Sequence, residues 1–402
     1  MSKRVKAIIF SASLLVAAFA VMGGLNVRAA GINKNEGAYR QIGVYSEVLS
    51  RIRSEYVEEP NLGLVTNGAL HGLLESLDPD SSYLNAEEYK VYKAHKSDGK
   101  GDIGATVSKP FGYAAVISVI PGGPADKAQI HNGDIIEAID GKSTREMSLA
   151  EVHNLVTGEP GSNVNFSLVR ARRAEPQKVT VTRAVVSVPA SSEKMMEANV
   201  GYIKVFAFNK GKAQEIASRL RSLEHAGAKK LILDLRNVSS GEPQEGISTA
   251  NLFLSRGAIA SLSGQKYKRE DFSADAQKAV TSLPLVVLVN RGTAGPAEIV
   301  AAAILDNTRG DVLGEKTFGE GSVQKVIEMP DGAALILSVA KYHSPSGKSI
   351  QDDAVTPNIT VAQEPDFGID EDETPQTPET NPQNAPDEQL RRAIEVLKNR
   401  PS

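Results

Sequence analysis

Two glycine-containing stretches carry the residues whose types and spacing could do chemistry. RGTAGPAE, Arg291 to Glu298, stands between the apolar run LPLVVLVN and a helix-like segment, and FGEG follows it at Phe318 to Gly321, with Gln324 just beyond. A junction between a strand and a helix is where a mixed α/β hydrolase places its nucleophile. The centre of the first stretch is nevertheless Gly295-Pro296, which has no hydroxyl and, at the proline, no backbone N–H.

Other side chains near these stretches could replace a missing nucleophile or base. The hydroxyl groups are those of Ser239, Ser240, Thr293 and Ser322, and the amine is that of Lys316. A hydroxyl needs a base within hydrogen-bond reach, at about 2.6–3.2 Å, and nothing in the sequence guarantees that geometry. We expect Lys316 to be a surface charge of a loop and His343, which precedes SPSG, to be a structural histidine.

Strand and helix patterns alternate from Val200 onward and predict an α/β layer. VGYIKVFAF, KLILDLRN and LPLVVLVN are typical of strands, and KAQEIASRLRSLEHAG, EGISTANLFLS and residues 296–307 are typical of helices. Functional groups in such a fold gather at the carboxyl ends of the strands. The candidate site is therefore expected where DLRNVSSGEP and RGTAGPAE follow two of these strands.

Segments of different character surround this layer. From about Gly101, short alternating strands (YAAVISVI, GDIIEAID, NVNFSLVRA, KVTVTRAVV) and a capping box at Ser148 to Glu151 predict a β-rich module with short helices. Apolar residues at helical spacing over 36–56 and 65–77 predict a small helical region, which ends at LDPDSSYLNAEEY. After Val361 an acidic, proline-rich linker leads to a final helix.

The final helix, DEQLRRAIEVLKNR, has Leu390, Ile394 and Leu397 on one face, so we expect it to dock back on the domain. The linker before it cannot bury enough apolar surface to become ordered.

The N-terminus has the pattern of an export signal. Lys3, Arg4 and Lys6 precede the apolar run from Ala7 to Met22, and Val27-Arg28-Ala29 offers a small-residue cleavage site. An uncleaved anchor in the inner membrane is the alternative, although the run is short for a spanning helix. We expect an exported protein of the periplasm or cell envelope, which contacts a membrane only through this signal or anchor.

Composition excludes several classes of protein. A chain of 402 residues should hold two or three domains, and its formal net charge of -4 argues against a partner of nucleic acid. It has no cysteine, which excludes disulfides and thiolate metal sites, and its six histidines lack the spacing of a zinc site. No metal and no cofactor are expected.

The β-rich module resembles a PDZ domain, on the residues GDIGATV and PGGPADKAQIHNGDIIEAIDG. The resemblance implies that Ile103, Gly104 and Ala105 form the loop whose N–H groups hold a peptide's terminal carboxylate, while the peptide adds a strand to the sheet. A sandwich with a glycine turn and no ligand is the alternative.

The order of LDPDSSYL, the PDZ-like module, GYIKVFAFN, LILDLRN, GEKTFGEGSVQ and HSPSGKSIQDDAVTPNI resembles the carboxyl-terminal processing (tail-specific) proteases over roughly residues 40–361. The resemblance implies a multidomain α+β fold with an N-terminal helical region, a PDZ-like domain and an α/β protease core. The expected segments are a signal or anchor (1–29), the helical region (30–97), the PDZ-like domain (98–186), the core (187–361), the linker (362–386) and the C-terminal helix (387–402).

In that family a serine nucleophile is activated by a lysine, which a glutamine holds in place. When the family motif Ser-Ala-Ser-Ala-Ser-Glu is set against TAGPAE, its central serine falls on Gly295; when Phe-Gly-Lys-Gly is set against FGEG, its lysine falls on Glu320. Gln324 is retained. The spacing between positions 295 and 320 suits the family, so the nucleophile and the base are both replaced.

The oxyanion region, Pro296, Ser240 and Gly241, also departs from the family. The residue after the nucleophile normally donates its N–H to the oxyanion, and Pro296 has none, a loss that typically costs about a hundred- to a thousand-fold in rate. The Asn-Pro-Gly-Gly that follows DLRN in the family has become VSSGE. As structure, GPAE remains a good helix start, with glycine at the N-cap, proline at the first position and Glu298 in the first turn.

These changes lead to the expectation that the protein is an exported, catalytically inactive member of the family. It would bind protein or peptide C-terminal tails through the PDZ domain and act as an adaptor or regulator, with an active protease relative as a further candidate partner. The alternative is an active serine-type endopeptidase with a rearranged catalytic site. A third reading is a structural envelope protein whose PDZ groove binds nothing.

Overall fold

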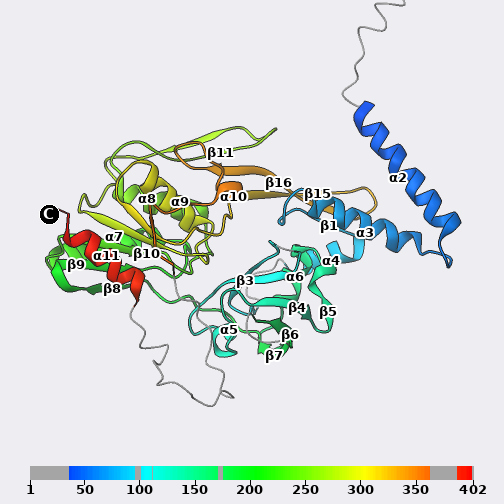
Figure 1. Cartoon of the computed structure of the whole chain (residues 1–402), viewed down its shortest axis with the longest axis horizontal. Helices are drawn as coiled ribbons and strands as arrows, with labels where there is room; N and C mark the ends of the chain where they lie inside the picture. The colour runs from blue at the N-terminus through cyan, green and yellow to red at the C-terminus, as the bar shows by residue number, and fades with distance from the viewer. Residues whose placement is uncertain (1–35, 96–100, 111, 171–174, 363–386, 401–402) are drawn as a thin grey trace, which may run out of the picture. The chain divides into compact units, whose positions relative to one another are not determined.

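The computed structural model describes residues 36–95, 101–110, 112–170, 175–362 and 387–400. The predicted export signal and nearly all of the predicted linker lie outside these residues. Within the described ranges, no helix is long and apolar enough to cross a membrane. The chain divides into two compact units, Met1–Ala69 and Leu70–Ser402, and Figure 1 follows it from the N-terminal helices to the C-terminal helix.

The predicted N-terminal helices are present as α2 (Glu36–Glu55) and α3 (Leu62–Glu75). Along α2, Arg51 forms ion pairs with the carboxylates one turn before and one turn after it, Glu47 at 2.9 Å and Glu55 at 2.7 Å. Such pairs at the i, i+4 spacing support a helix whose faces are exposed.

The PDZ-like module is a sheet with the strand order β2-β3-β4-β6-β7 and β5 paired to β4. Its strands are β2 (Ala105–Ser108), β3 (Ala114–Val119), β4 (Ile135–Ile139), β5 (Lys142–Ser143), β6 (Asn163–Val169) and β7 (Gln177–Thr182). Its helices are α5 (Pro124–Lys127) and α6 (Leu149–Val156). The predicted capping box of α6 is confirmed, since Ser148 Oγ accepts from Glu151 N while Glu151 Oε2 accepts from Ser148 N.

The core of the larger unit is a sheet with the order β17-β14-β13-β10-β9-β8, parallel except for the pair of β8 and β9. Its strands are β8 (Ser192–Met195), β9 (Val200–Lys204), β10 (Lys230–Asp234), β13 (Leu285–Val289), β14 (Asp311–Gly314) and β17 (Ile359–Thr360). Every residue of β10 and β13 is buried, as expected of parallel strands covered on both faces. The predicted α/β layer is confirmed.

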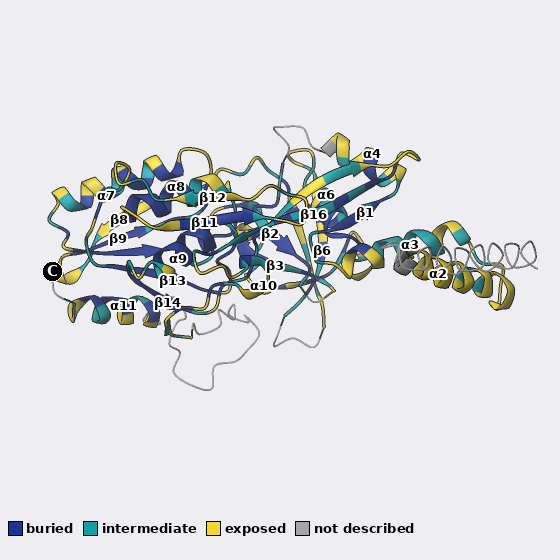
Figure 2. Ribbon diagram, turned by 90° about the horizontal axis from the view of Figure 1, so that it is seen from above, coloured by how far each residue is buried: buried dark blue, intermediate teal, exposed yellow. Residues whose placement is uncertain are grey.

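Helices cover both faces of this sheet. Figure 2 shows α7 (Lys212–His225) and α8 (Pro243–Phe253) on one side of the buried strands and α11 (Glu388–Lys398) on the other. The hydrophobic cluster of α7, α8 and α9 (Pro296–Asp306) is separate from the cluster that α11 completes.

An antiparallel sheet, not predicted from the sequence, stands beside this core with the order β1-β16-β11-β12 and β15 paired to β16. Its strands are β1 (Ser82–Leu84), β11 (Ala258–Ser263), β12 (Glu270–Ser273), β15 (Ser322–Glu328) and β16 (Ala334–His343). Two short helices adjoin it, α4 (Ala86–His95) and α10 (Ile350–Asp353). The last three residues of LDPDSSYL form β1. Just before this strand, Asp78 Oδ1 accepts from Ser338 Oγ of β16 at 3.0 Å. Its two longest strands, β15 and β16, have mixed exposure without strict alternation, so their sequences lack the period that predicts a half-buried strand.

The prediction that the last helix docks on the core is confirmed. Ile394 and Leu397 are buried against β10, β13 and β14. Lys230 Nζ donates to the carbonyl groups of Leu397 at 2.6 Å and Arg400 at 2.9 Å, which satisfies carbonyls at the end of α11.

We predict that Leu397→Ala lowers the free energy of unfolding by about 2–4 kcal/mol, because it leaves a cavity between α11 and the sheet. Urea unfolding measures this loss. Arg392→Ala is the matched control on the exposed face of the same helix and should change stability by less than about 0.5 kcal/mol. Equal effects of the two changes would show that α11 does not contribute to the core.

Candidate functional site

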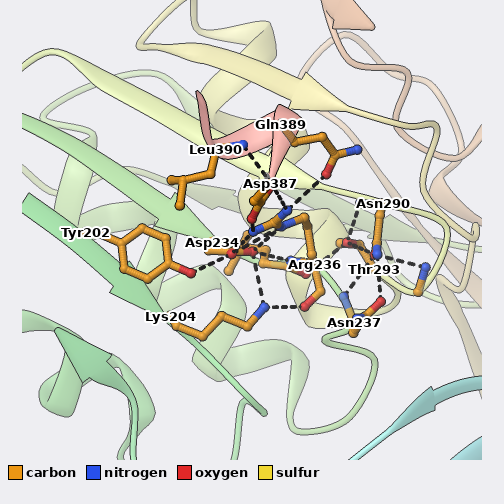
Figure 3. Close-up of polar contacts among 12 residues, drawn as sticks. Tyr202, Lys204, Asp234, Arg236, Asn237, Asn290, Thr293, Asp387, Gln389 and Leu390 are labelled. Carbon is orange, nitrogen blue, oxygen red and sulfur yellow. Dashed lines mark hydrogen bonds and ion pairs between the residues drawn. The ribbon is translucent and has the colours of Figure 1, made fainter. Parts of the chain in front are cut away.

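The carboxyl end of β10 is held by a buried carboxylate, Asp234, which is 1% exposed. Tyr202 Oη donates to it at 2.7 Å and Lys204 Nζ at 3.1 Å, and Arg236 donates from its backbone N–H and its guanidinium. Figure 3 shows these groups converging on one carboxylate. Arg236 also forms two hydrogen bonds with Asp387, at 2.9 and 2.8 Å, and so ties the start of α11 to this strand end.

Burial alone would raise the pKa of Asp234, but the positive charges of Lys204 and Arg236 hold it well below its usual range. Burial also lowers the pKa of Lys204, which Asp234 opposes. The carboxylate therefore stays ionised and keeps its donors in place at neutral pH. This cluster fixes the direction in which the DLRNVSSGEP segment leaves the sheet.

The two strand ends of the candidate site are joined by a pair of asparagines. Asn290 Nδ2 donates to Asn237 Oδ1 at 2.6 Å, and Asn237 N donates to Asn290 Oδ1 at 2.9 Å. Thr293 Oγ1 accepts from Asn290 N and donates to the carbonyl of Leu235. The hydroxyl of Thr293 is thus fully buried and used in structure, which argues against its having a catalytic role.

The helix α9 begins as predicted, at Gly295-Pro296. Gly295 has φ 58° and ψ -120°, a conformation that favours glycine, and Pro296 occupies the first helical position. Around Gly295 there is room for a side chain, since a Cβ would lie 3.7 Å from the carbonyl of Ser239. Backbone conformation, rather than space, opposes a serine at this position.

The prediction for Glu298 was incomplete, because this side chain does more than favour the helix dipole. It is fully buried, and its Oε2 accepts from the N–H groups of both Gly295, at 3.0 Å, and Glu320, at 2.7 Å. Its Oε1 accepts from Gly319 N at 2.8 Å and from the hydroxyl of Thr317. One carboxyl group therefore brings the positions assigned to the nucleophile and the base together.

Burial raises the pKa of Glu298 to about 8, although the hydroxyl of Thr317 and the N–H groups of Glu320 and Gly319 oppose the shift. Burial likewise raises the pKa of Glu320 to about 7, and the negative charge of Asp80 adds to this shift. The position that the resemblance assigns to a basic amine thus holds a carboxyl group whose charge is disfavoured. Among the described residues, no hydrogen bond or ion pair is formed by the side chain of Glu320.

A chain of hydrogen-bonded polar groups links Asp80 to Gln324, the glutamine that matches the family motif. Asp80 Oδ2 accepts from Ser322 Oγ at 2.6 Å and from Gln351 Nε2 at 3.3 Å. Gln324 Nε2 in turn donates to Ser322 Oγ at 2.6 Å. Burial raises the pKa of Asp80, which the hydrogen bond from Ser322 opposes.

Two of the hydroxyl groups that the sequence suggested differ in their partners. Ser322 forms a hydrogen bond with the carboxyl group of Asp80, whereas Ser239 forms none with a carboxyl group of the described residues. Ser239 donates to Thr106 Oγ1 at 2.7 Å and makes a short contact with Ser118 Oγ, so that it joins the PDZ-like sheet to the end of β10. Lys316 is exposed.

The predicted oxyanion region contains a close backbone approach. Gly241 has φ 124°, and a Cβ there would lie 2.4 Å from the backbone of Phe208, which glycine alone avoids. Phe208 N donates to the carbonyl of Ser240 at 2.8 Å. Pro296 supplies no N–H, so the donor expected after the nucleophile is lacking at this position.

The residues predicted to bind a peptide lie at the start of β2. Ile103 is fully buried, Gly104 has φ 74°, and Ala105 begins the strand. No group of His, Asp and Glu side chains in the described part of the chain could hold a metal ion.

Reasoning from sequence missed Asp80, and with it the carboxyl neighbour of Glu320. LDPDSSYL carries part of the family resemblance, but nothing in its pattern indicates contact with a segment more than 200 residues away. It also missed the linking role of Glu298, for which its place three residues after the N-cap was the available signal.

Comparison with known proteins agrees with this architecture. A family model described as peptidase family S41 matches residues 199–361, and a model described as PDZ domain matches residues 116–170. A carboxy-terminal-processing protease of Bartonella bacilliformis is 31% identical over 363 residues, which cover 89% of this chain and 83% of that protein. The carboxy-terminal processing protease CtpA of Bacillus subtilis is 33% identical over 82% of this chain and 71% of that protein.

A solved structure extends the likeness to three dimensions. The photosystem II D1 C-terminal processing protease superposes with a TM-score of 0.66 at 27% identity, over 79% of this chain and 86% of that one. The fold is therefore that of a PDZ-containing serine peptidase. The chain belongs to peptidase family S41, the family of the carboxyl-terminal processing proteases.

We predict that Glu320→Gln makes the protein more stable relative to the native chain at pH 8 than at pH 5. The pKa of Glu320 is raised from 4.5 to about 7, so the folded state holds its proton more tightly than the unfolded state. That contribution is fully present below pH 4.5 and is lost as the pH rises through 7, which the neutral amide avoids.

The difference between the two proteins should grow by about 2–3 kcal/mol between pH 5 and pH 8, measured by urea unfolding. Glu242→Gln, a change at an exposed carboxylate, serves as the control and should give no such growth. A constant difference for Glu320→Gln would contradict the raised pKa.

Proposed function

We propose that this protein is a non-cleaving member of peptidase family S41, exported to the cell envelope, which binds polypeptide segments at or near protein C-termini through its PDZ domain. It acts there as an adaptor or a regulator, and an active relative is a candidate partner.

The observation that carries the proposal is the chemistry of the joined strand ends. Gly295 and Glu320 donate their N–H groups to the same oxygen of Glu298, so the two positions lie together as a catalytic pair would. Neither supplies the required group: glycine has no nucleophile, and the side chain of Glu320 is a carboxyl group whose pKa is raised by burial and by the negative charge of Asp80. The scaffold is retained while the chemistry is lost.

Binding is supported by the position of the PDZ-like sheet. Thr106 of β2 and Ser118 of β3 contact Ser239 beside the strand end, so the strand to which a peptide would be added adjoins the former catalytic region. β2 lies at the edge of its sheet, which is where a peptide adds.

The experiment measures peptidase activity of the purified full chain on an unfolded protein substrate. We expect no cleavage by the native protein. A variant that carries Gly295→Ser, Pro296→Ala and Glu320→Lys should gain measurable cleavage, and adding Gln324→Ala should reduce it. Because a serine at position 295 is strained by about 1–3 kcal/mol, thermal unfolding must first show that the variant is folded.

A second candidate function is peptide cleavage by a rearranged site, which the contact between Ser322 and Asp80 favours. Cleavage by the native chain that stops in Ser322→Ala would support it and would contradict the proposal. Ser346→Ala, which changes an exposed serine in the turn after β16, is the control. Thr293→Val cannot serve as a control, because the buried hydroxyl of Thr293 forms hydrogen bonds that hold the fold. Cleavage that persists in Ser322→Ala would point to another group or to a contaminant.

A further inference from the structure

The loop that the PDZ resemblance assigns to a peptide's terminal carboxylate already contains a side-chain carboxylate, that of Asp102. Asp102 Oδ1 accepts the N–H of Gly104 at 2.6 Å, and Gly104 is the residue with left-handed backbone at the centre of the loop. The backbone of Asp102 is fixed in turn, since its N–H donates to the carbonyl of Ala184 at 2.8 Å and its carbonyl accepts from Ala184 N at 3.1 Å. The carboxylate is therefore held in the loop by the fold.

A buried cation accompanies this carboxylate. Arg183 is 8% exposed; its Nη1 and Nη2 donate to Ser162, Asn163 and Leu155, while its Nε is buried and has no partner within the described ranges. Among those residues no carboxylate forms an ion pair with it, yet its charge favours the ionised form of Asp102. Asp102 thus supplies a negative charge in the loop where a PDZ domain would otherwise receive that charge from the terminal carboxylate of its peptide ligand.

The groove beside the loop is bridged as well. His153 of α6 forms a hydrogen bond from its Nε2 to the carbonyl of Val107 in β2, at 3.1 Å. A peptide added to this edge of β2 must replace that contact. Burial raises the pKa of Asp102, whereas the N–H of Gly104 and the charges of His153 and Arg183 oppose the shift.

We propose that Asp102 is a specificity-determining residue, an internal carboxylate that occupies the terminal-carboxylate loop and directs the PDZ groove toward extended segments without a free α-carboxylate. An entering carboxylate would compete for the N–H of Gly104 and would lie against a like charge, which is costly where both groups are partly removed from water. A chain that continues past the loop, or one with a neutral end, meets no such repulsion. This inference rests on the proposed function in one respect, that the PDZ domain binds polypeptide.

The test uses decapeptides that end in each of the amino acids, each made once with a C-terminal acid and once with a carboxamide. Fluorescence anisotropy measures their binding to the full chain. We expect the native protein to favour the carboxamide of a pair by about tenfold or more, and Asp102→Asn and Asp102→Ala to abolish or reverse that preference. Asp140→Asn removes a negative charge from an exposed turn of the same domain and should leave the preference unchanged.

A native protein that favours the acids would overturn the proposal, as would a preference that survives in Asp102→Ala. If no peptide binds in either form, the proposed binding function fails, and the occupation of the loop is then decided by NMR of glycine-labelled protein. We expect the amide resonance of Gly104 to shift in Asp102→Ala and not in Asp140→Asn. An unchanged Gly104 resonance would overturn the internal carboxylate independently of peptide binding.

Discussion

The carboxyl group of Glu298 is the contact on which the candidate site depends. It receives the N–H groups of Gly295, Gly319 and Glu320, and thereby fixes the start of α9 against the loop that leads into β15. Because it is fully buried, it has no water to replace a lost donor, and each missing partner would be costly. This contact uses backbone groups of its partners and does not depend on the side chain at position 295.

The hydrogen bonds at the carboxyl ends of β9 and β10 also do not depend on the residues assigned to catalysis. Asp234 collects Tyr202, Lys204 and Arg236, and Arg236 reaches Asp387 at the start of the last helix. These bonds couple the docking of α11 to the path of the loop after β10. Selection for a folded, docked core would therefore keep the shape of the site whether or not a reaction takes place there.

Carboxyl groups stand at both of the places where the family's function would call for something else. Glu320 stands where the family resemblance predicts a cationic base, and Asp102 stands in the loop that the resemblance assigns to a peptide's carboxylate. Under the proposed function, the two carboxyl groups disfavour cleavage at a free C-terminus and favour the binding of a chain that continues. The hydroxyl contacts of Ser239 with Thr106 and Ser118 join the segment after β10 to the PDZ-like sheet within the same compact unit.

The sequence by itself determined the parallel strands and the helices of the α/β layer, the order of the domains and the helix start at Gly295-Pro296, because hydrophobic period, capping residues and proline act locally along the chain, but it did not determine the antiparallel sheet of β1, β11, β12, β15 and β16. Through motif resemblance it also predicts that Gly295 and Glu320 stand at the nucleophile and base positions. Only the tertiary structure decided that Asp80 faces Glu320, that Ser322 has a carboxyl neighbour, and that Ser239 and Thr293 are engaged in structure. Those contacts join segments far apart in sequence, and burial, which sets the pKa of Glu298 and Glu320, exists only once the chain has folded.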